Sequence, residues 1–237
     1  SNKESLIAAL KQMEAEGKVD IRFNQKNQLE YLHLKHSSFT DASLFHLKGP
    51  VVSNLKELDL GRTNLSNKCL EHLKQLPALV GLYLGSWSNE ETLKIITREF
   101  PQIESMAMWG DIDGSLKSTS SKFIGTHPKL TRVHLNYFDL SKPEYMEGLK
   151  DLHNRVTVFE IGKCYLTDDS ISRLMDLRPN ITEIYLNIRQ DDLRVTDKAL
   201  TNLNRLPNLK VLGINYDGRV TRMPFSNAAL VNFQTSK

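Results

Sequence analysis

The chain has 237 residues, of which 31 are Lys or Arg and 28 are Asp or Glu, so its formal net charge is +3. This near balance gives no indication of nucleic-acid binding, and a hydrophobic content of 40% excludes a disordered chain. Two cysteines, Cys69 and Cys164, are too few for a disulfide-rich secreted scaffold. No apolar run approaches the roughly 20 residues of a membrane-spanning helix. We therefore expect an intracellular protein, cytoplasmic or nuclear, that binds neither nucleic acid nor membrane.

The first 28 residues differ from the rest of the chain. Ser1-Asn2 without an initiator methionine is typical of the scar that a cloning protease site leaves. A helix is predicted from about Glu4 to Glu16, followed by an extended segment from Ile21 to Phe23. We interpret residues 1–28 as this scar and an N-terminal cap over the end of the array that follows.

One apolar pattern recurs through residues 29–220: an apolar residue, two others, an apolar residue, one other, and an apolar residue. Successive copies are 24 to 28 residues apart, and a near-constant spacing over so many copies is far beyond chance. The copies start at Leu29, Leu55, Leu79, Ile103, Leu130, Val156, Ile181 and Leu209. The last two apolar residues of each copy are two apart, as on one face of a strand. Stretches of helical spacing follow the strands, for example at Leu70–Leu76, Ile171–Leu177 and Leu200–Leu206.

The ends of the predicted helices are marked as well. Thr167 and Thr196 can accept hydrogen bonds from the first helical turn, and a proline precedes several of the next copies. A unit of one strand and one helix cannot bury its apolar face alone, so the units must stack. The sequence therefore predicts an α/β array with about eight parallel strands on a concave face and helices on the convex face. Residues 221–237 are expected to form a C-terminal cap.

Two of the copies also carry a family likeness. Residues 55–76 (LKELDLGRTNLSNKCLEHLKQL) and 156–177 (VTVFEIGKCYLTDDSISRLMDL) resemble the LxxLxLxxxxLTDxxLxxL form of leucine-rich repeats. The form is that of the ribonuclease-inhibitor-like and cysteine-containing subfamilies, and the latter occurs in F-box-type substrate receptors of ubiquitin ligases. The resemblance covers about residues 29–220 and implies a horseshoe-shaped solenoid. It also implies substrate recognition in a ubiquitin-ligase complex as one function, with the ligase adaptor bound by a segment outside this sequence.

The sequence departs from the family form at one position. Eight residues after the first leucine, such repeats usually carry Asn or Cys, and only Cys164 matches here. This departure puts the cysteine-containing subfamily in doubt.

The concave face can be read from the strand alternation. Residues two, four and six places after the first apolar residue of each copy are predicted to point outward on that face. Large rings stand beside small residues there, as in protein interfaces, and acidic residues outnumber basic ones, unlike a nucleic-acid groove. Trp87, Tyr137 and Tyr216 are expected at the rim. The predicted partner-binding residues are Asp59, Tyr83, Trp87, Trp109, Arg132, His134, Glu160 and Tyr185.

We accordingly predict a protein-binding module without enzymatic activity, metal or cofactor. His33 and His134 lie in separate units about a hundred residues apart, so they are not expected to share a metal ion. One alternative is a structural or assembly factor held inside a larger complex, which predicts a large exposed apolar patch.

A second alternative is a phosphatase, because Asp111-Ile112-Asp113-Gly114-Ser115 follows a strand. The segment resembles the start of haloacid-dehalogenase-type phosphatases, in which one carboxylate attacks phosphorus and the other handles the proton of the leaving group. Asp191 and Asp192 would then supply the acidic pair that holds Mg²⁺. Against this, the segment falls in the turn of a repeat, where a solvated turn is the simpler interpretation.

Overall fold

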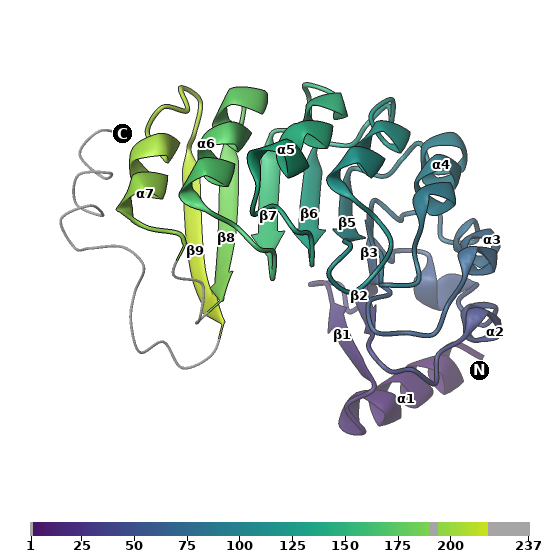
Figure 1. Cartoon of the computed structure of the whole chain (residues 1–237). Coiled ribbons are helices and arrows are strands. Elements are labelled where there is room, and N and C mark those ends of the chain that lie inside the picture. The colour runs from purple at the N-terminus through teal and green to yellow at the C-terminus, as the bar shows by residue number, and fades with distance from the viewer. Residues whose placement is uncertain (1, 190–193, 218–237) are drawn as a thin grey trace.

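A computed structural model describes residues 2–189 and 194–217, which form one open α/β sheet with its strands in chain order (Figure 1). Strands β2 to β9 pair in parallel, and β1 pairs with β2 in antiparallel fashion. The strands are β1 (Val19–Phe23), β2 (Leu29–Leu34), β3 (Glu57–Asp59), β4 (Gly81–Tyr83), β5 (Ser105–Trp109), β6 (Arg132–Asn136), β7 (Val158–Gly162), β8 (Glu183–Arg189) and β9 (Val211–Asp217).

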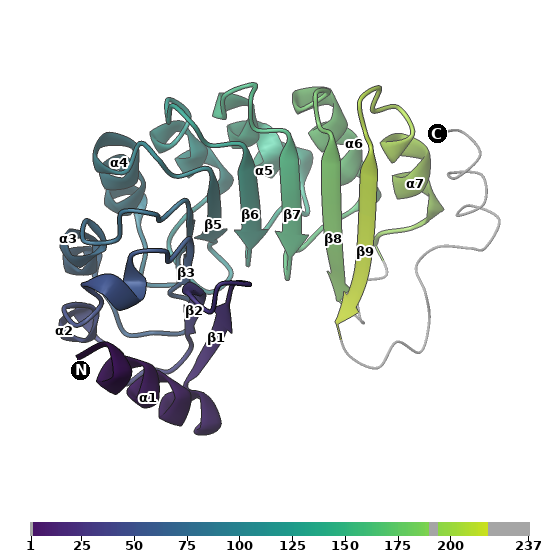
Figure 2. The same ribbon diagram turned by 180° about the vertical axis from the view of Figure 1, so that it is seen from behind.

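Helices connect successive strands and cover one face of this sheet, as the two opposite views show (Figures 1 and 2). The α-helices are α1 (Asn2–Ala15), α2 (Asp41–Leu44), α3 (Leu70–Leu73), α4 (Glu90–Glu99), α5 (Pro143–Met146), α6 (Asp168–Leu177) and α7 (Asp197–Leu203). Short 3-10 helices are η1 (Pro50–Val52), η2 (Asn67–Cys69), η3 (Ser118–Phe123) and η4 (Glu147–Asp151). Within residues 2–189 and 194–217, no helix is long and apolar enough to cross a membrane.

The register of the sheet confirms the repeated pattern. Equivalent positions of neighbouring units pair directly, so that Leu58 lies beside Leu82, and Val133 lies beside Phe159. These four side chains are fully buried and belong to one continuous apolar core between the sheet and its helices. Burying a side chain of this size stabilises the fold by about 1.5 to 3 kcal/mol. The apolar faces of successive units are therefore closed against each other.

The N-terminal segment is also part of the sheet. β2 to β9 are the eight parallel strands that the repeat predicted, and the extended segment expected from Ile21 to Phe23 belongs to β1, which adds a ninth, antiparallel strand among the described residues. The chain between β1 and β2 is too short for a parallel crossover, which leaves the antiparallel hairpin. Asn24 and Asn27 form its turn: the Asn24 side chain accepts hydrogen bonds from two turn amides, and Asn27 has a φ of 58°. The predicted helix is present as α1, whose Leu10 is buried against the core.

The helical layer varies more than the strands do. α4 and α6 are regular helices, each begun by a capping side chain from Asn89 or Thr167. Between them, the layer consists of η3, the short α5 and η4. The η3 sequence is rich in serine, a residue that favours turns over helix interiors. The predicted C-terminal cap, residues 221–237, lies outside the described residues.

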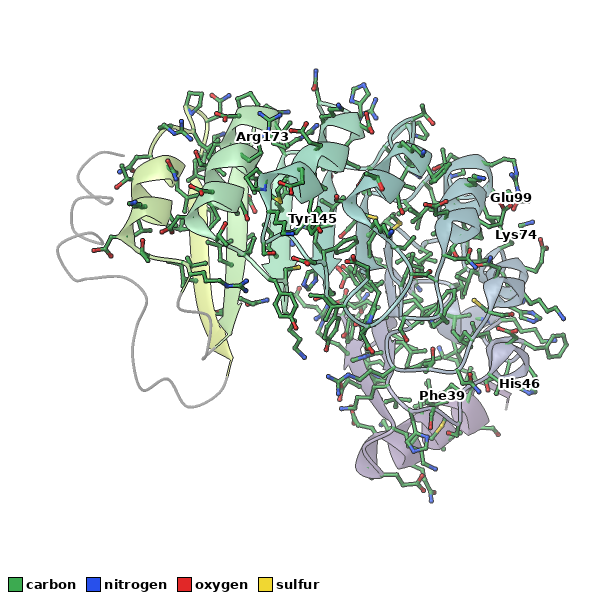
Figure 3. The ribbon with its side chains drawn as sticks, in the orientation of Figure 1. Phe39, His46, Lys74, Glu99, Tyr145 and Arg173 are labelled. Atoms are coloured by element: carbon green, nitrogen blue, oxygen red, sulfur yellow. The ribbon has the colours of Figure 1, made fainter. Side chains whose placement is uncertain are left out.

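Ion pairs connect neighbouring units on the helical side (Figure 3). Lys74, just after α3, lies 3.2 Å from Glu99 at the end of α4, and Arg173 of α6 pairs with Glu147 of η4. These side chains are partly exposed, so each pair adds about 0 to 1 kcal/mol. The opposite face of the sheet carries no helix within the described parts of the chain. We call it the open face; it is formed by Glu57, Asp59, Gly81, Tyr83, Ser105, Ala107, Arg132, His134, Val158, Glu160, Glu183 and Tyr185.

Candidate functional site on the open face

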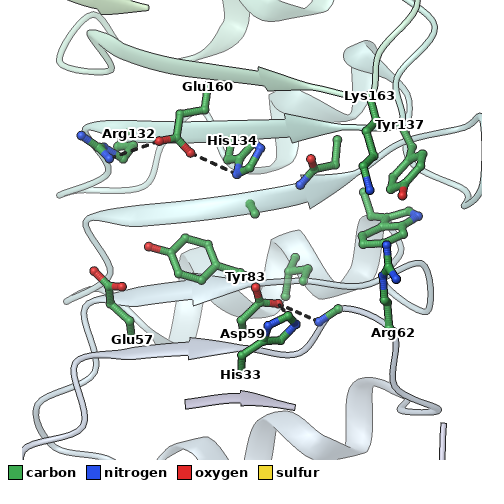
Figure 4. A pocket seen from close by; sticks show the side chains of 15 residues that line it. His33, Glu57, Asp59, Arg62, Tyr83, Arg132, His134, Tyr137, Glu160 and Lys163 are labelled. Atoms are coloured by element: carbon green, nitrogen blue, oxygen red, sulfur yellow. Dashed lines mark hydrogen bonds and ion pairs between the residues drawn. The ribbon is translucent and has the colours of Figure 1, made fainter. Parts of the chain in front are cut away.

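A pocket of about 320 Å³ lies on the open face, over strands β3 to β7 (Figure 4). The parallel register explains its composition, because it places equivalent positions of five strands side by side. These positions are Asp59, Tyr83, Ala107, His134 and Glu160. Six of the eight predicted partner-binding residues line the pocket: Asp59, Tyr83, Trp109, Arg132, His134 and Glu160.

The middle strand of the pocket, β5, carries a small residue between larger ones. Ala107 is 3% exposed and contributes only a methyl group to the lining. The ring of Tyr83 lies along its own strand, with its hydroxyl 3.5 Å from Ser105 Oγ, and a Cβ at Gly81 would come within 3.2 Å of that hydroxyl. Because Gly81 has no side chain, the ring of Tyr83 can lie close to it. A small residue beside a ring leaves the hollow that the alternation predicted.

One wall of the pocket is a carboxylate and a histidine. His33 lies between two acids, with Nδ1 3.4 Å from Asp20 and Nε2 3.6 Å from Asp59 (Figure 4 shows His33 and Asp59). The Asp59 carboxylate also accepts a hydrogen bond of 2.9 Å from the amide of Gly61. Burial raises the pKa of Asp59, and the nearby His33 opposes this only in part. By contrast, the hydrogen bond from Lys35 lowers the pKa of the more exposed Asp20.

The opposite wall is a chain of polar contacts on β6 to β8. His134 Nδ1 lies 3.1 Å from Glu160, and Arg132 lies 3.5 Å from both Glu160 and Glu183. Tyr185 donates a hydrogen bond of 2.9 Å to Glu183. Burial lowers the pKa of His134, although Glu160 opposes the shift, so the neutral imidazole is favoured near neutral pH. Its Nε2 is buried, has no hydrogen-bond partner among the described residues, and would lie 3.0 Å from a Cβ at Gly162.

At the loop end of the strands, aromatic and basic side chains complete the pocket. Trp109 stacks on Tyr137 with 4.4 Å between ring centroids, and its Nε1 donates a hydrogen bond of 3.3 Å to Asp113. Lys163 lies 5.5 Å from the centre of the Tyr137 ring, and Arg62 also lines this end (Figure 4). The stacking leaves Trp109 only 8% exposed. Trp109 thus borders the pocket while stacked on a loop residue, and its role in partner binding stays a prediction.

Comparison with known proteins identifies no relative. No family model matches the chain, and no curated protein is significantly similar to it.

Arg62, Tyr137 and Lys163 share a feature that links the loops to the pocket. Each follows its strand at the same place in its unit and has a positive φ, of 65°, 58° and 54° respectively. This left-handed conformation costs a non-glycine residue about 1 to 2 kcal/mol. The alternation of strand residues did not reach this position, so Arg62 and Lys163 were missed and Tyr137 was expected only at the rim. Their equivalent place in three repeats was the signal that could have found them.

The other predicted residues lie apart from the pocket. Trp87 donates a hydrogen bond of 3.2 Å to the carbonyl of Leu60 and is half-buried against Gly85. Tyr185 lies next to the pocket on β8, with the Arg132 guanidinium 5.8 Å from its ring centre. The side chain of Tyr216 lies outside the described residues. The predicted set therefore divides into one group in the pocket and two flanking residues.

The acidic segment considered for phosphatase chemistry forms an exposed turn after β5. Asp111 accepts a hydrogen bond of 3.1 Å from the amide of Asp139, and Asp113 accepts the one from Trp109. Asp191 and Asp192 lie outside the described residues. In residues 2–189 and 194–217, no group of three or more His, Cys, Asp and Glu side chains could hold a metal ion. These two hydrogen bonds connect the turn to the next unit and to Trp109.

The two acids that flank His33 are expected to affect stability in opposite directions. Because the pKa of Asp59 is raised on folding, its charged form costs stability near neutral pH, and Asp59→Asn should raise the Tm at pH 7. This gain should shrink as the pH falls and the wild-type carboxyl takes up its proton. Asp20, whose pKa is lowered, stabilises the fold in its charged form. Asp20→Asn should therefore lower the Tm at pH 7, with a loss that also shrinks at low pH. Thermal unfolding from pH 7 to about pH 2 measures both, because the loss in Asp20→Asn shrinks only below the ordinary aspartate pKa of 3.8. Shifts of the same sign would contradict the assignment.

Proposed function

We propose that the chain is a leucine-rich repeat protein, that its sheet is the concave face of a horseshoe, and that this face binds a segment of another protein. The observation that carries the proposal is the open face itself. It bears rings, charges and a pocket, and no helix covers it within the described residues. Nine strands at about 4.8 Å give a width of about 38 Å, enough for the roughly 800 Å² that each partner buries in a standard interface.

The composition of this face suits protein recognition. Tyr83 and Tyr185 offer partly buried rings, and Arg132 offers a planar donor between two carboxylates. Tyrosine and arginine dominate the binding energy of protein interfaces. One specific form of the proposal is substrate recognition in a ubiquitin-ligase complex, with the adaptor bound by a segment outside this sequence. This form rests on the resemblance of the repeats alone.

A second candidate is an assembly factor that docks through its helical side. An apolar groove of about 630 Å³ lies between α1 and α2, lined by Leu6, Met13 and Phe39 among others, and Phe45 nearby is 49% exposed. Its apolar lining favours a permanent contact with another protein. The two candidates differ in which side of the molecule they use, so they can be separated by substitution.

The test uses peptides selected against the whole chain from a random display library. The double variant Tyr83→Ala, Arg132→Ala is expected to weaken binding of the selected peptides by about 30-fold or more, equivalent to about 2 kcal/mol. The matched variant Phe45→Ala, Tyr145→Ala removes two exposed rings from the helical side and should leave affinity within about twofold. Fluorescence anisotropy measures the affinities, and circular dichroism checks the fold. Loss of binding in the second variant alone would favour the assembly factor.

A further inference from the structure

We infer that the pocket on the open face receives a cationic side chain, lysine or arginine, of the bound protein segment. The inference deepens the proposed function and rests on it. It depends on three features of the pocket: its local charge, its aromatic walls and its small central residue.

The carboxylates of Asp59 and Glu160 stand two strands to either side of Ala107 and line the pocket with it. Arg132 is shared between Glu160 and Glu183 at 3.5 Å each, so one cation faces two carboxylates on that wall. Across the pocket, the one ion-pair partner of Asp59 among the described residues is His33 at 3.6 Å, and His33 is itself shared with Asp20. Two walls therefore each carry a carboxylate that no cation fully compensates. A cation between them would gain from both, and the low polarity of a partly buried site strengthens that attraction.

Asp59 is the carboxylate that an added cation would stabilise most. Its side chain is 26% exposed, so it has given up much of its contact with water. The Gly61 amide satisfies one of its oxygens at 2.9 Å but brings no full charge. The raised pKa of Asp59 has the same cause, since burial disfavours the charged form. An incoming ammonium or guanidinium group would replace the lost solvation with a charge-assisted hydrogen bond.

The remaining walls are rings. Tyr83 and Trp109 both line the pocket, and a Cβ at Gly61 would lie 3.3 Å from the Trp109 ring and 3.2 Å from Asp59. Indole and carboxylate thus border the same gap. A cation close to tyrosine or tryptophan is attracted to the face of the ring in addition to any ion pair. The methyl group of Ala107 leaves room between these walls for the aliphatic part of a lysine or arginine.

The basic residues of the pocket do not favour an anion at this point. Lys163 lies over the ring of Tyr137, and Arg62 is exposed at the same loop end (Figure 4). Arg132 is held by its two glutamates. An acidic side chain placed over Ala107 would have like charges, Asp59 and Glu160, two strands away on either side. We therefore assign the pocket to a cation.

The probes are small amides measured by NMR on the whole chain. Nα-acetyl-arginine amide and Nα-acetyl-lysine amide should shift the Ala107 methyl and Trp109 indole signals in a saturable manner. The citrulline analogue, which has nearly the shape of arginine without its charge, should bind at least tenfold more weakly. Nα-acetyl-glutamate amide should not bind. Absence of saturable shifts, equal binding of citrulline, or binding of glutamate would overturn the inference.

Matched variants locate the effect. Asp59→Asn and Glu160→Gln should each weaken arginine amide binding at least fivefold. Asp20 is the other acid beside His33, but Asp20 does not line the pocket. Asp20→Asn should therefore change binding less than twofold. An equal loss in all three variants would indicate a diffuse surface charge and contradict a built site. Two variants in the pocket keep the test decisive if one of them folds poorly.

The selected peptides separate this inference from the proposed function. If peptides bind the open face equally well after citrulline replaces their arginines and norleucine replaces their lysines, the cation pocket is wrong and the binding function stands. If the amides bind in the pocket but every selected peptide depends on the helical side, the pocket stands and the proposed function is wrong.

Discussion

Replacing Arg178 with methionine is expected to lower the free energy of unfolding by about 3 to 5 kcal/mol. This arginine is 2% exposed at the end of α6, and its guanidinium donates hydrogen bonds to the carbonyls of Leu152, His153 and Val156, at 2.6, 2.8 and 2.9 Å. It thereby ties one unit to the loop of the unit before it. Methionine fills similar space but donates nothing, so three carbonyls would each lose a hydrogen bond at once, and of these the His153 carbonyl would keep the Val156 amide as a donor. Urea unfolding followed by circular dichroism measures the change.

Two controls define this result. Arg98→Met removes an arginine whose side chain is 62% exposed and should change stability by no more than about 0.5 kcal/mol. Arg178→Lys keeps the charge but lacks the planar fork, so it should satisfy only some of the carbonyls and fall between the two. If Arg178→Met cost less than about 1 kcal/mol, water would be able to replace the guanidinium, and its structural role would be wrong.

Gly148→Ala is expected to destabilise the protein by about 3 kcal/mol or more. A Cβ at this position would lie 2.1 Å from the carbonyl oxygen of Ser118 and 2.4 Å from the amide nitrogen of Thr119. Both are backbone atoms of η3, so a rotamer change cannot relieve the clash. The φ of Gly148 is not positive, so the expected loss of stability comes from the steric clash and not from backbone strain. The substitution should push η4 away from η3 and lower the midpoint of urea unfolding.

Gly81→Ala is the matched control for this prediction. Its new methyl group would meet Glu57 Cγ at 3.1 Å and the Tyr83 hydroxyl at 3.2 Å, both on side chains that can move. The expected loss is below about 1 kcal/mol, although the Tyr83 ring should shift. Equal losses of stability in the two variants would mean that the tight contact between η3 and η4 is not what destabilises Gly148→Ala.

Both predictions concern contacts between units, and this bears on the function proposed for the open face. The strands β3 to β7 that position most of the pocket residues have only three to five residues each, so the places of these residues depend on how each unit packs on its neighbours. A binding site formed by five strands needs those neighbours fixed. Arg178 lies on the helical side, where such contacts hold the units in register.

The strands and the core could be predicted from the sequence because they follow from a period. Leu58, Leu82 and Val133 repeat at the same place in successive units, and the same alternation assigned Asp59, Tyr83 and His134 to the opposite face. In a parallel sheet, equal positions in equal units become neighbours. The sequence by itself therefore determined the buried face, the open face and most of the pocket residues.

The tertiary structure decided what the period does not contain. Trp109 is buried because Tyr137 of the next unit, which itself has the left-handed conformation, stacks on its ring. Lys163 has the same conformation at the equivalent place of the following unit and lines the pocket. β1 pairs antiparallel to β2 through a short hairpin, and η4 packs on η3 through a close approach between their backbones at Gly148. Each of these features is set by atoms of a neighbouring segment and not by the residue's own place in the repeat. That is the physical reason why periodicity located the site while only the folded chain showed its walls.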